Sequence, residues 1–350
     1  MTDTTNRSRA IAAWLFVCAG AVAFMVVLGG ATRLTESGLS IVHWKPFTGF
    51  IPPLNDAEWR ALFEAYRDSP EFRKVNFWMT VEDFKTIFWL EFLHRLWGRV
   101  LGLLFLLPFL WFIFRRAISR AMGWRLGIVF VLGGLQGVLG WYMVKSGLVD
   151  VPSVSQYRLA AHLLLAFLIY ALLMWYGFRY RFPDRMAGPR RGLGTLLVCW
   201  ISVTVCWGAL VAGMDAGLAY NSFPLMDGRV VPEGIGRLSP WWLNAFENTA
   251  AVQFIHRVLG IGTVVLALYA AWAVRNDGAA TRRAALVLAI MALAQMALGI
   301  ATLLSHVALP LAVAHQGGAL VVLTFALWFL YVPGLAAAPA RRENSAAPSR

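Results

Sequence analysis

Charged side chains are scarce in this sequence. Asp, Glu, Lys and Arg make up 14% of its 350 residues, whereas a soluble globular domain carries about 25%. In their place the chain is 59% hydrophobic, with a mean hydropathy of +0.63. This balance excludes an ordinary soluble domain and predicts an all-α polytopic membrane protein.

Cysteine is nearly absent, with three residues in the whole chain. Cys18, Cys199 and Cys206 all fall inside long apolar stretches, and none lies in the segments that join these stretches. An external disulfide framework is therefore excluded, and a closed zinc site with thiolate ligands is disfavoured. We interpret the three thiols as small packing residues.

Eight apolar stretches are long enough to cross a bilayer, which takes about 20 helical residues. The first stretch is too long and too rich in Trp and Phe for a signal peptide, and no small-residue cleavage site follows it. The spans are predicted at residues 11–32, 88–114, 126–144, 159–178, 193–214, 249–274, 284–304 and 311–332.

The positive charges that give the net charge of +13 are concentrated in the segments predicted to lie on one side of the membrane. With the amino terminus inside, the cytoplasmic segments hold 17 basic and four acidic residues, and the external segments hold 11 basic and 13 acidic ones. Such an excess follows the positive-inside rule and predicts that both termini are cytoplasmic. The charge thus indicates a lipid bilayer as partner and excludes nucleic acid.

A basic segment at 179–192, which contains Pro183, Gly188 and Pro189, divides the spans into two groups of four. We predict a cytoplasmic tail at 1–10, an amino-terminal four-helix half at 11–178 and a carboxy-terminal four-helix half at 193–333. Residues 334–350, rich in Ala, Pro and Arg, are predicted to be a disordered cytoplasmic tail.

Several motifs occur once in each half and in the same order, which indicates an internal duplication. Because each half holds an even number of spans, the two halves would share one topology and relate by an axis along the membrane normal. The matches are Glu91-Phe-Leu-His94-Arg95 with Gln253-Phe-Ile-His256-Arg257, Gln136 to Gly140 with Gln295 to Gly299, and Ala161-His162 with Ala314-His315.

The first external segment contains a short amphipathic pattern. Trp59, Phe63 and Tyr66 share one helical face after Asn55, a residue that caps helices well. This helix either packs at the membrane surface or covers a site. Thr80 and Asp83 then resemble a capping box at the start of the second span.

Four of the six histidines open the even-numbered spans, so they lie at a similar depth near the outer surface. One turn deeper on each helix the residue is small, which leaves room for a flat macrocycle whose iron the imidazole ligates. We predict two haem-sized sites, His94 with His162 and His256 with His315. The alternative is helix-end histidines packed against lipid headgroups. The four small residues are Gly98, Ala166, Gly260 and Ala319.

Arg95 and Arg257 each follow one of these histidines, where haem propionates would lie. The alternative is a pair of arginines that extend to the membrane surface. Arg99 has no counterpart in the second half. His43 and His306 lack the small residue one turn deeper and are interpreted as surface histidines.

Together these residues resemble the haem A synthase family, in its mitochondrial and proteobacterial branch. The resemblance implies an enzyme that oxidises a ring methyl of haem O to a formyl, giving the haem A of terminal oxidases. It also implies that His256 and His315, with Arg257 and Gly260 beside them, hold a haem b cofactor. His94 and His162 would bind the substrate iron, and Glu91 would be essential.

The same resemblance implies haem O synthase and an electron acceptor as partners, and a place in the bacterial cytoplasmic membrane. A homo-oligomer is left open. Some family members carry a cysteine pair in the first external loop, and this chain has none. Any mechanism that uses those thiols is therefore excluded here.

The residues themselves agree on which half does chemistry. Oxidation of a methyl group requires proton transfer near the carbon, and only the first half has a carboxylate, Glu91, beside its histidine. The matching Gln253 cannot titrate. Desolvation of Glu91 would suit it to act as acid and base, and its alternative role is a structural partner of Arg95 or an imidazole.

Two other functions fit the sequence less well. A dihaem electron carrier of the cytochrome b kind would place histidines near both membrane faces, but all four lie near one face. A transporter or assembly factor built from repeats would require polar groups near the midplane and broken helices. The spans contain little of either.

Overall fold

The computed structural model describes residues 2–43, 48–147, 154–183 and 190–332. Eight of its helices are long and apolar enough to cross a membrane, and they confirm the eight predicted spans. The chain is a multi-pass membrane protein. The spanning helices are α1 (Thr2–Leu34), α4 (Val81–Phe114), α5 (Arg120–Gly147), α6 (Gln156–Arg181), α7 (Arg191–Gly213), α9 (Thr249–Ala273), α10 (Ala279–Leu304) and α11 (Leu309–Tyr331).

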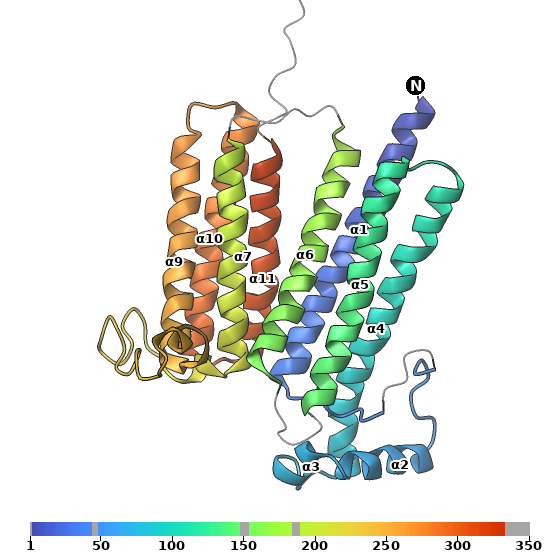
Figure 1. The fold of residues 1–350 in the computed structure, drawn as a ribbon, viewed down its shortest axis with the longest axis vertical. Helices are drawn as coiled ribbons and strands as arrows, with labels where there is room; N and C mark the ends of the chain where they lie inside the picture. Colours follow the sequence, from blue (N-terminus) through green and yellow to red (C-terminus); the bar gives the residue numbers. More distant parts are fainter. Residues whose placement is uncertain (1, 44–47, 148–153, 184–189, 333–350) are drawn as a thin grey trace, which may run out of the picture.

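The other described elements are short helices in the two long connections. They are α2 (Asp56–Arg67), α3 (Pro70–Lys74), η1 (Ala216–Leu218), η2 (Trp241–Leu243) and α8 (Asn244–Glu247). All lie at the end of the molecule opposite the amino terminus, the lower end in Figure 1. The predicted tail at 334–350 and the centre of the predicted linker fall outside the described residues.

The spanning helices form two groups of four (Figure 1), with α1, α4, α5 and α6 in one and α7, α9, α10 and α11 in the other. The groups meet where α6 packs against α7 and α1 packs against α11. A twofold repeat would pair α1 with α7 and α6 with α11, so these two interfaces would be equivalent. The division into halves and the duplication stay predictions, which this arrangement supports.

Matched hydrogen bonds between helices also support the predicted duplication. In the first half, Trp97 Nε1 of α4 donates to Ala21 O of α1 at 3.0 Å. In the second half, Trp200 Nε1 of α7 donates to Leu259 O of α9, also at 3.0 Å. When the two halves are aligned, Trp97 corresponds to Leu259, and Ala21 corresponds to Trp200. Both bonds therefore join the same two aligned positions. The tryptophan that donates lies on α4 in the first half and on α7, the counterpart of α1, in the second.

Polar contacts connect the two halves at several depths. Arg33 Nη2 lies 2.9 Å from Asp215 Oδ1 at the lower end. Gln316 Nε2 of α11 donates to Val26 O of α1 at 2.8 Å. Hydrogen bonds between spanning helices form in hydrocarbon without competition from water, so they help to hold the halves in one register.

The predicted amphipathic helix is α2, and it packs over the amino-terminal end of α4 (Figure 1). Trp59, Phe63 and Tyr66 are buried against Phe84 and Phe88 of α4. The capping box of Thr80 and Asp83 is present, so α4 begins at Val81, seven residues before the predicted span. One face of the first turns of α4 is thereby covered by protein.

Candidate functional site

His256 of α9 and His315 of α11 face each other inside the second half. Their ring centroids are 6.4 Å apart and their planes are nearly perpendicular, at 88°. Two imidazoles that ligate one metal ion from opposite sides have centres roughly 6 Å apart, because the metal–nitrogen distance is about 2 Å and the ring radius about 1 Å. The spacing therefore fits a single iron held between the two rings.

The hydrogen bond of His256 supports this role. Its Nδ1 lies 3.2 Å from Thr204 O, and a carbonyl oxygen can only accept. Nδ1 therefore carries the proton, and Nε2 keeps its lone pair for a metal. One turn deeper, a Cβ built on Gly260 would meet nothing within 4 Å, so the space beside the ring is open to a macrocycle.

A glutamine anchors the backbone at one histidine in each half. Gln136 Nε2 donates to His162 O at 2.9 Å, and Gln295 Nε2 donates to His315 O at 2.7 Å. Gln295 Nε2 also lies 3.2 Å from His315 Nδ1. Because an imidazole that ligates iron through Nε2 carries its proton on Nδ1, this weaker contact has to give way when His315 ligates.

The first half brings His94 of α4 and His162 of α6 together as the second predicted pair. His94 lies against Gly29 of α1, and His162 lies against Gly140 of α5. His162 Nδ1 and Gln136 Oε1 are buried and have no hydrogen-bond partner among the described residues. Unpaired polar atoms of this kind are costly. A protonated His162 Nδ1 and the acceptor Gln136 Oε1 are complementary to each other, which would leave Nε2 for a metal.

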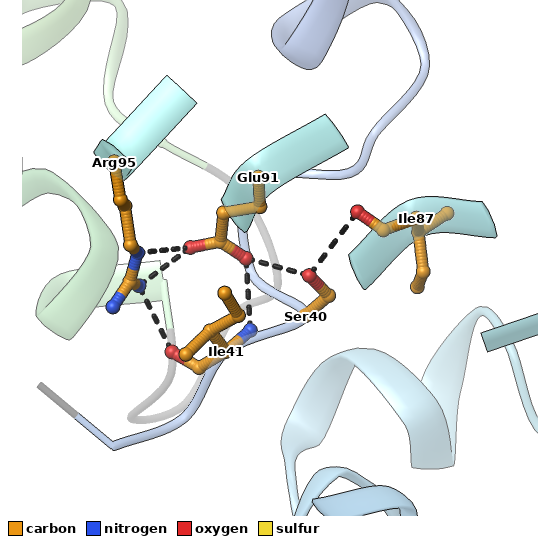
Figure 2. A network of polar contacts seen from close by, with 5 residues as sticks. All are labelled: Ser40, Ile41, Ile87, Glu91 and Arg95. Atoms are coloured by element: carbon orange, nitrogen blue, oxygen red, sulfur yellow. Dashed lines mark hydrogen bonds and ion pairs between the residues drawn. The ribbon is translucent and has the colours of Figure 1, made fainter. Parts of the chain in front are cut away.

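Glu91 lies one turn before His94 and is 2% exposed. Figure 2 shows its carboxylate between α4 and the segment that follows α1. Oε2 accepts from Ser40 Oγ at 2.7 Å and from Ile41 N at 2.8 Å, and Oε1 accepts from Arg95 Nε at 2.9 Å and from Arg95 Nη2. Four donors stabilise the ionised carboxylate.

Arg95 extends the same network. Its Nη2 also donates to Ile41 O at 2.9 Å (Figure 2), so the guanidinium connects Glu91 to the external segment. A structural pairing with Arg95 was the alternative role considered for Glu91, and this contact is present. A role of Arg95 toward a propionate stays a prediction.

The second half has the matching network without the charge. Gln253 is 2% exposed and donates from Nε2 to Tyr220 O at 3.1 Å. Arg257 donates to Ser222 O and Tyr220 O, both at 2.9 Å. Its Nε is buried without a partner among the described residues. That donor fits an acceptor such as a haem propionate.

The remaining sequence candidates lie outside the two pairs. His43 is exposed in the segment that follows α1, and His306 is exposed in the turn between α10 and α11. Arg99 lies with its guanidinium carbon 5.2 Å from the ring centroid of Phe50. The three cysteines are free and lie in the spanning helices α1 and α7.

Sequence reasoning missed Ser40 and Ile41 as partners of Glu91. They lie about 50 positions before it in the chain, and one of them acts through its backbone. The weak signal available was the Gly-Leu pair at 38–39, which recurs at 217–218 in the segment that contacts Gln253 and Arg257.

The chain was compared with known proteins. The sequence profile described as cytochrome oxidase assembly protein (COX15-CtaA) matches residues 12–327. The chain belongs to this family. It is 50% identical over 328 residues to a protein named heme A synthase from Nitrosospira multiformis, an alignment that covers 91% of this chain and 92% of that protein.

Other members of the family are nearly as similar. The heme A synthase of Rhodospirillum centenum is 49% identical over 330 residues, covering 93% of this chain and 88% of the relative. That of a Bradyrhizobium species is 49% identical over 333 residues, covering 92% and 91%. The resemblance inferred from the histidines and Glu91 is thereby confirmed.

A second buried carboxylate lies outside the membrane helices of this family member. Glu71 of α3 is 4% exposed, and its Oε2 has no hydrogen-bond partner among the described residues. Burial, assisted by the charge of Glu91, raises the pKa of Glu71 to about 8. The sequence analysis did not single out this residue.

Glu71 should therefore make stability depend on pH. The folded protein keeps this proton up to a pKa of about 8, whereas an unfolded chain releases it near 4.5. Between these values the folded state binds more protons, so stability falls as pH rises. We expect Glu71→Gln to remove part of this fall in thermal melts from pH 5 to 9. Exposed Glu64 is the control, and a Glu64→Gln protein should melt like wild type.

Proposed function

We propose that this chain is a haem A synthase, which oxidises a ring methyl of haem O to a formyl group. Proteins with that name align with 91–93% of it. The observation that carries the proposal is the set of two histidine pairs inside the membrane, of which only one has a carboxylate one turn away. One site thus suits a resident haem, and the other suits a haem that reacts.

We assign the resident haem b to the second half. His256 and His315 have the spacing that a single iron requires, and the unpaired Nε of Arg257 provides a donor for a propionate. Gln253 and the backbone carbonyls of Tyr220 and Ser222 in its network cannot titrate. When bound, a bis-histidine haem b would carry electrons away from the substrate.

Differences in packing support the first half as the substrate half. In the most apolar stretches of α4 and α5, 11% and 6% of residues are buried, compared with 33% and 28% in α9 and α10. A cofactor that stays bound favours a closed bundle. A substrate that enters from the bilayer and leaves as product requires helices that are less tightly enclosed.

An apolar cavity of about 390 Å³ lies in the same half, between α5 and α6. Leu139 and Trp141 of its lining flank Gly140, which lies against His162. No cofactor assignment depends on this cavity. A large apolar substrate could approach His162 along these apolar side chains.

Glu91 is the residue to which we assign proton handling near the substrate methyl. Conversion of a methyl to a formyl removes hydrogen from carbon, so a base near that carbon is required. Ser40, Ile41 and Arg95 donate hydrogen bonds that fix the position of the Glu91 carboxylate one turn before His94. Haem O synthase and an electron acceptor stay predicted partners.

The function is tested by pigment analysis. We expect a host that makes haem O but no haem A to form haem A when this chain is produced, and haem extracts to show this by chromatography. A dihaem electron carrier, the second candidate, would bind haem b and leave haem O unchanged. Persistence of haem O with a fully loaded protein would therefore contradict the enzyme assignment.

We also propose that the protein lies in the bacterial cytoplasmic membrane with both termini in the cytoplasm. Fusions of alkaline phosphatase at Ala65 and Pro232 should be active, because both positions are predicted to be external. Fusions at Arg120 and Gly278 should be inactive, while a reporter that works only in the cytoplasm should give the reverse pattern. One reversed position would contradict the common depth of the four histidines.

A further inference from the structure

Each of the four histidines lies against a glycine of a neighbouring helix. The glycines belong to α1, α5, α7 and α10, which are the helices that carry no histidine of either pair. In the aligned halves, Gly29 corresponds to Gly208 and Gly140 to Gly299. The pairs are Gly29 with His94, Gly140 with His162, Gly208 with His256 and Gly299 with His315.

The approach is closest in the second half. A Cβ built on Gly299 would lie 2.7 Å from Cε1 of His315, and one built on Gly208 would lie 3.0 Å from Cε1 of His256. A carbon–carbon contact is optimal at about 3.5–4.0 Å. Any residue other than glycine would therefore push the imidazole away from its place.

The first half repeats the contact with slightly more room. A Cβ on Gly29 would lie 3.1 Å from Nε2 of His94, and one on Gly140 would lie 3.2 Å from Cε1 of His162. In all four cases the near atom belongs to the Cε1–Nε2 edge of the ring. That edge contains the nitrogen left for iron when Nδ1 is protonated.

Close packing places other glycines in this bundle, since a Cβ built on Gly177 would lie 2.6 Å from Phe16 and one built on Gly262 would lie 2.6 Å from Trp200. What the four glycines share is that the neighbour each time is a histidine of one of the two pairs. Glycine inside a helix costs about 0.5–1 kcal/mol relative to alanine, so its use at all four positions needs a specific cause. At Gly20, Gly127 and Gly192, on three of the same helices, an added Cβ would meet nothing within 4 Å. Gly29, Gly140, Gly208 and Gly299 differ from these three glycines because the nearest atom to an added Cβ belongs to a histidine ring.

We propose that Gly29, Gly140, Gly208 and Gly299 are positioning residues that set where each axial imidazole presents its metal-binding edge. This inference rests on the proposed function and deepens it. The bare backbone lets the ring sit between two helices, so its tilt is fixed by contact on the glycine side. A methyl group there would move the ring into the space of the macrocycle or turn its lone pair away from iron.

The second half provides the spectroscopic test. We expect Gly299→Ala and Gly208→Ala to lower the retained low-spin haem b about 10-fold, as loss of orienting contacts does at metal sites. The remaining haem should have a shifted low-spin EPR signal or a high-spin one. Gly192→Ala, on the same helix as Gly208, should keep the wild-type haem content and spectrum.

The first half provides a crossed control. Gly29→Ala and Gly140→Ala should leave the haem b spectrum unchanged and weaken the binding of added haem O, measured by titration of the purified protein. Gly20→Ala and Gly127→Ala should bind haem O as wild type does. General destabilisation by a helix substitution would affect both haems together, whereas ring positioning affects only the haem of its own half.

Three outcomes would overturn the inference. One is a wild-type spectrum in both Gly208→Ala and Gly299→Ala. Another is a loss of both haems in every glycine variant. The third is that Gly208→Ala and Gly299→Ala fail to accumulate in cells although His315→Ala, which lacks haem, does accumulate. The glycines would then be required for helix packing alone. If wild type itself lacked low-spin haem b, the cofactor assignment would fail instead, which keeps the two proposals distinct.

Discussion

Proteins with His256→Ala or His315→Ala should be purified with at least about 10-fold less tightly bound haem b than wild type. Each substitution removes one of two rings whose centroids lie 6.4 Å apart, and a haem held from one side only is released more easily. The haem that remains should be high-spin, because a strong-field ligand is missing. Haem content is measured from pyridine haemochrome spectra.

The structure offers matched controls for this prediction. His306→Ala, in the turn between α10 and α11, and His43→Ala, in the external segment, should keep haem b at the wild-type level. His94→Ala and His162→Ala should also keep it, but lose haem A formation. A full complement of low-spin haem b in both His256→Ala and His315→Ala would show that the two halves have been assigned wrongly.

Much of the fold was predictable because bilayer thickness imposes a length on every span. Each apolar window of the sequence became one helix, and the capping box of Thr80 and Asp83 was visible as a local pattern. The capping box correctly predicted the start of α4, whereas the apolar span was predicted to begin only at residue 88, because Glu82, Asp83 and Lys85 interrupt the apolar run. The first turns of α4 are packed against α2, and a hydropathy window does not detect burial by another part of the protein.

The histidine pairs were predictable for a different reason. A repeated motif makes equivalent positions recognisable even when each residue alone is uninformative. The partners of Glu91 were not, since Ser40 and Ile41 lie about 50 residues away and contact it through an irregular segment. Burial of Glu71 escaped prediction because charged residues in short amphipathic helices usually face water.

Replacing Glu91 with glutamine should lower haem A formation at least about 100-fold, the range that a positioned acid–base group contributes, while haem b is retained. The substitution is nearly isosteric and reproduces Gln253 of the second half. Haem O, or a partly oxidised intermediate at the alcohol level, should accumulate on the protein. Chromatography of extracted haems measures all three species. As a control, Gln253→Glu should leave activity close to wild type.

The contact of Glu91 with Arg95 complicates the single substitution. Glu91→Gln leaves the guanidinium of Arg95 without its counter-ion at a site where its side chain is 17% exposed, and an unpaired buried charge is destabilising. Loss of activity could then follow from a displaced external segment. The double variant Glu91→Gln/Arg95→Gln removes both charges, and Arg95→Gln alone keeps the carboxylate.

A double-mutant cycle over these four proteins separates the two roles of Glu91. If the carboxylate accepts a proton from the substrate, both variants without it should stay inactive, and Arg95→Gln should keep measurable haem A formation. If Glu91 serves only to neutralise Arg95, the double variant should recover most of the activity lost in Glu91→Gln. Such a recovery, or normal haem A from Glu91→Gln, would assign Glu91 to the attachment of the segment at Ser40 and Ile41, and the base would have to be sought elsewhere.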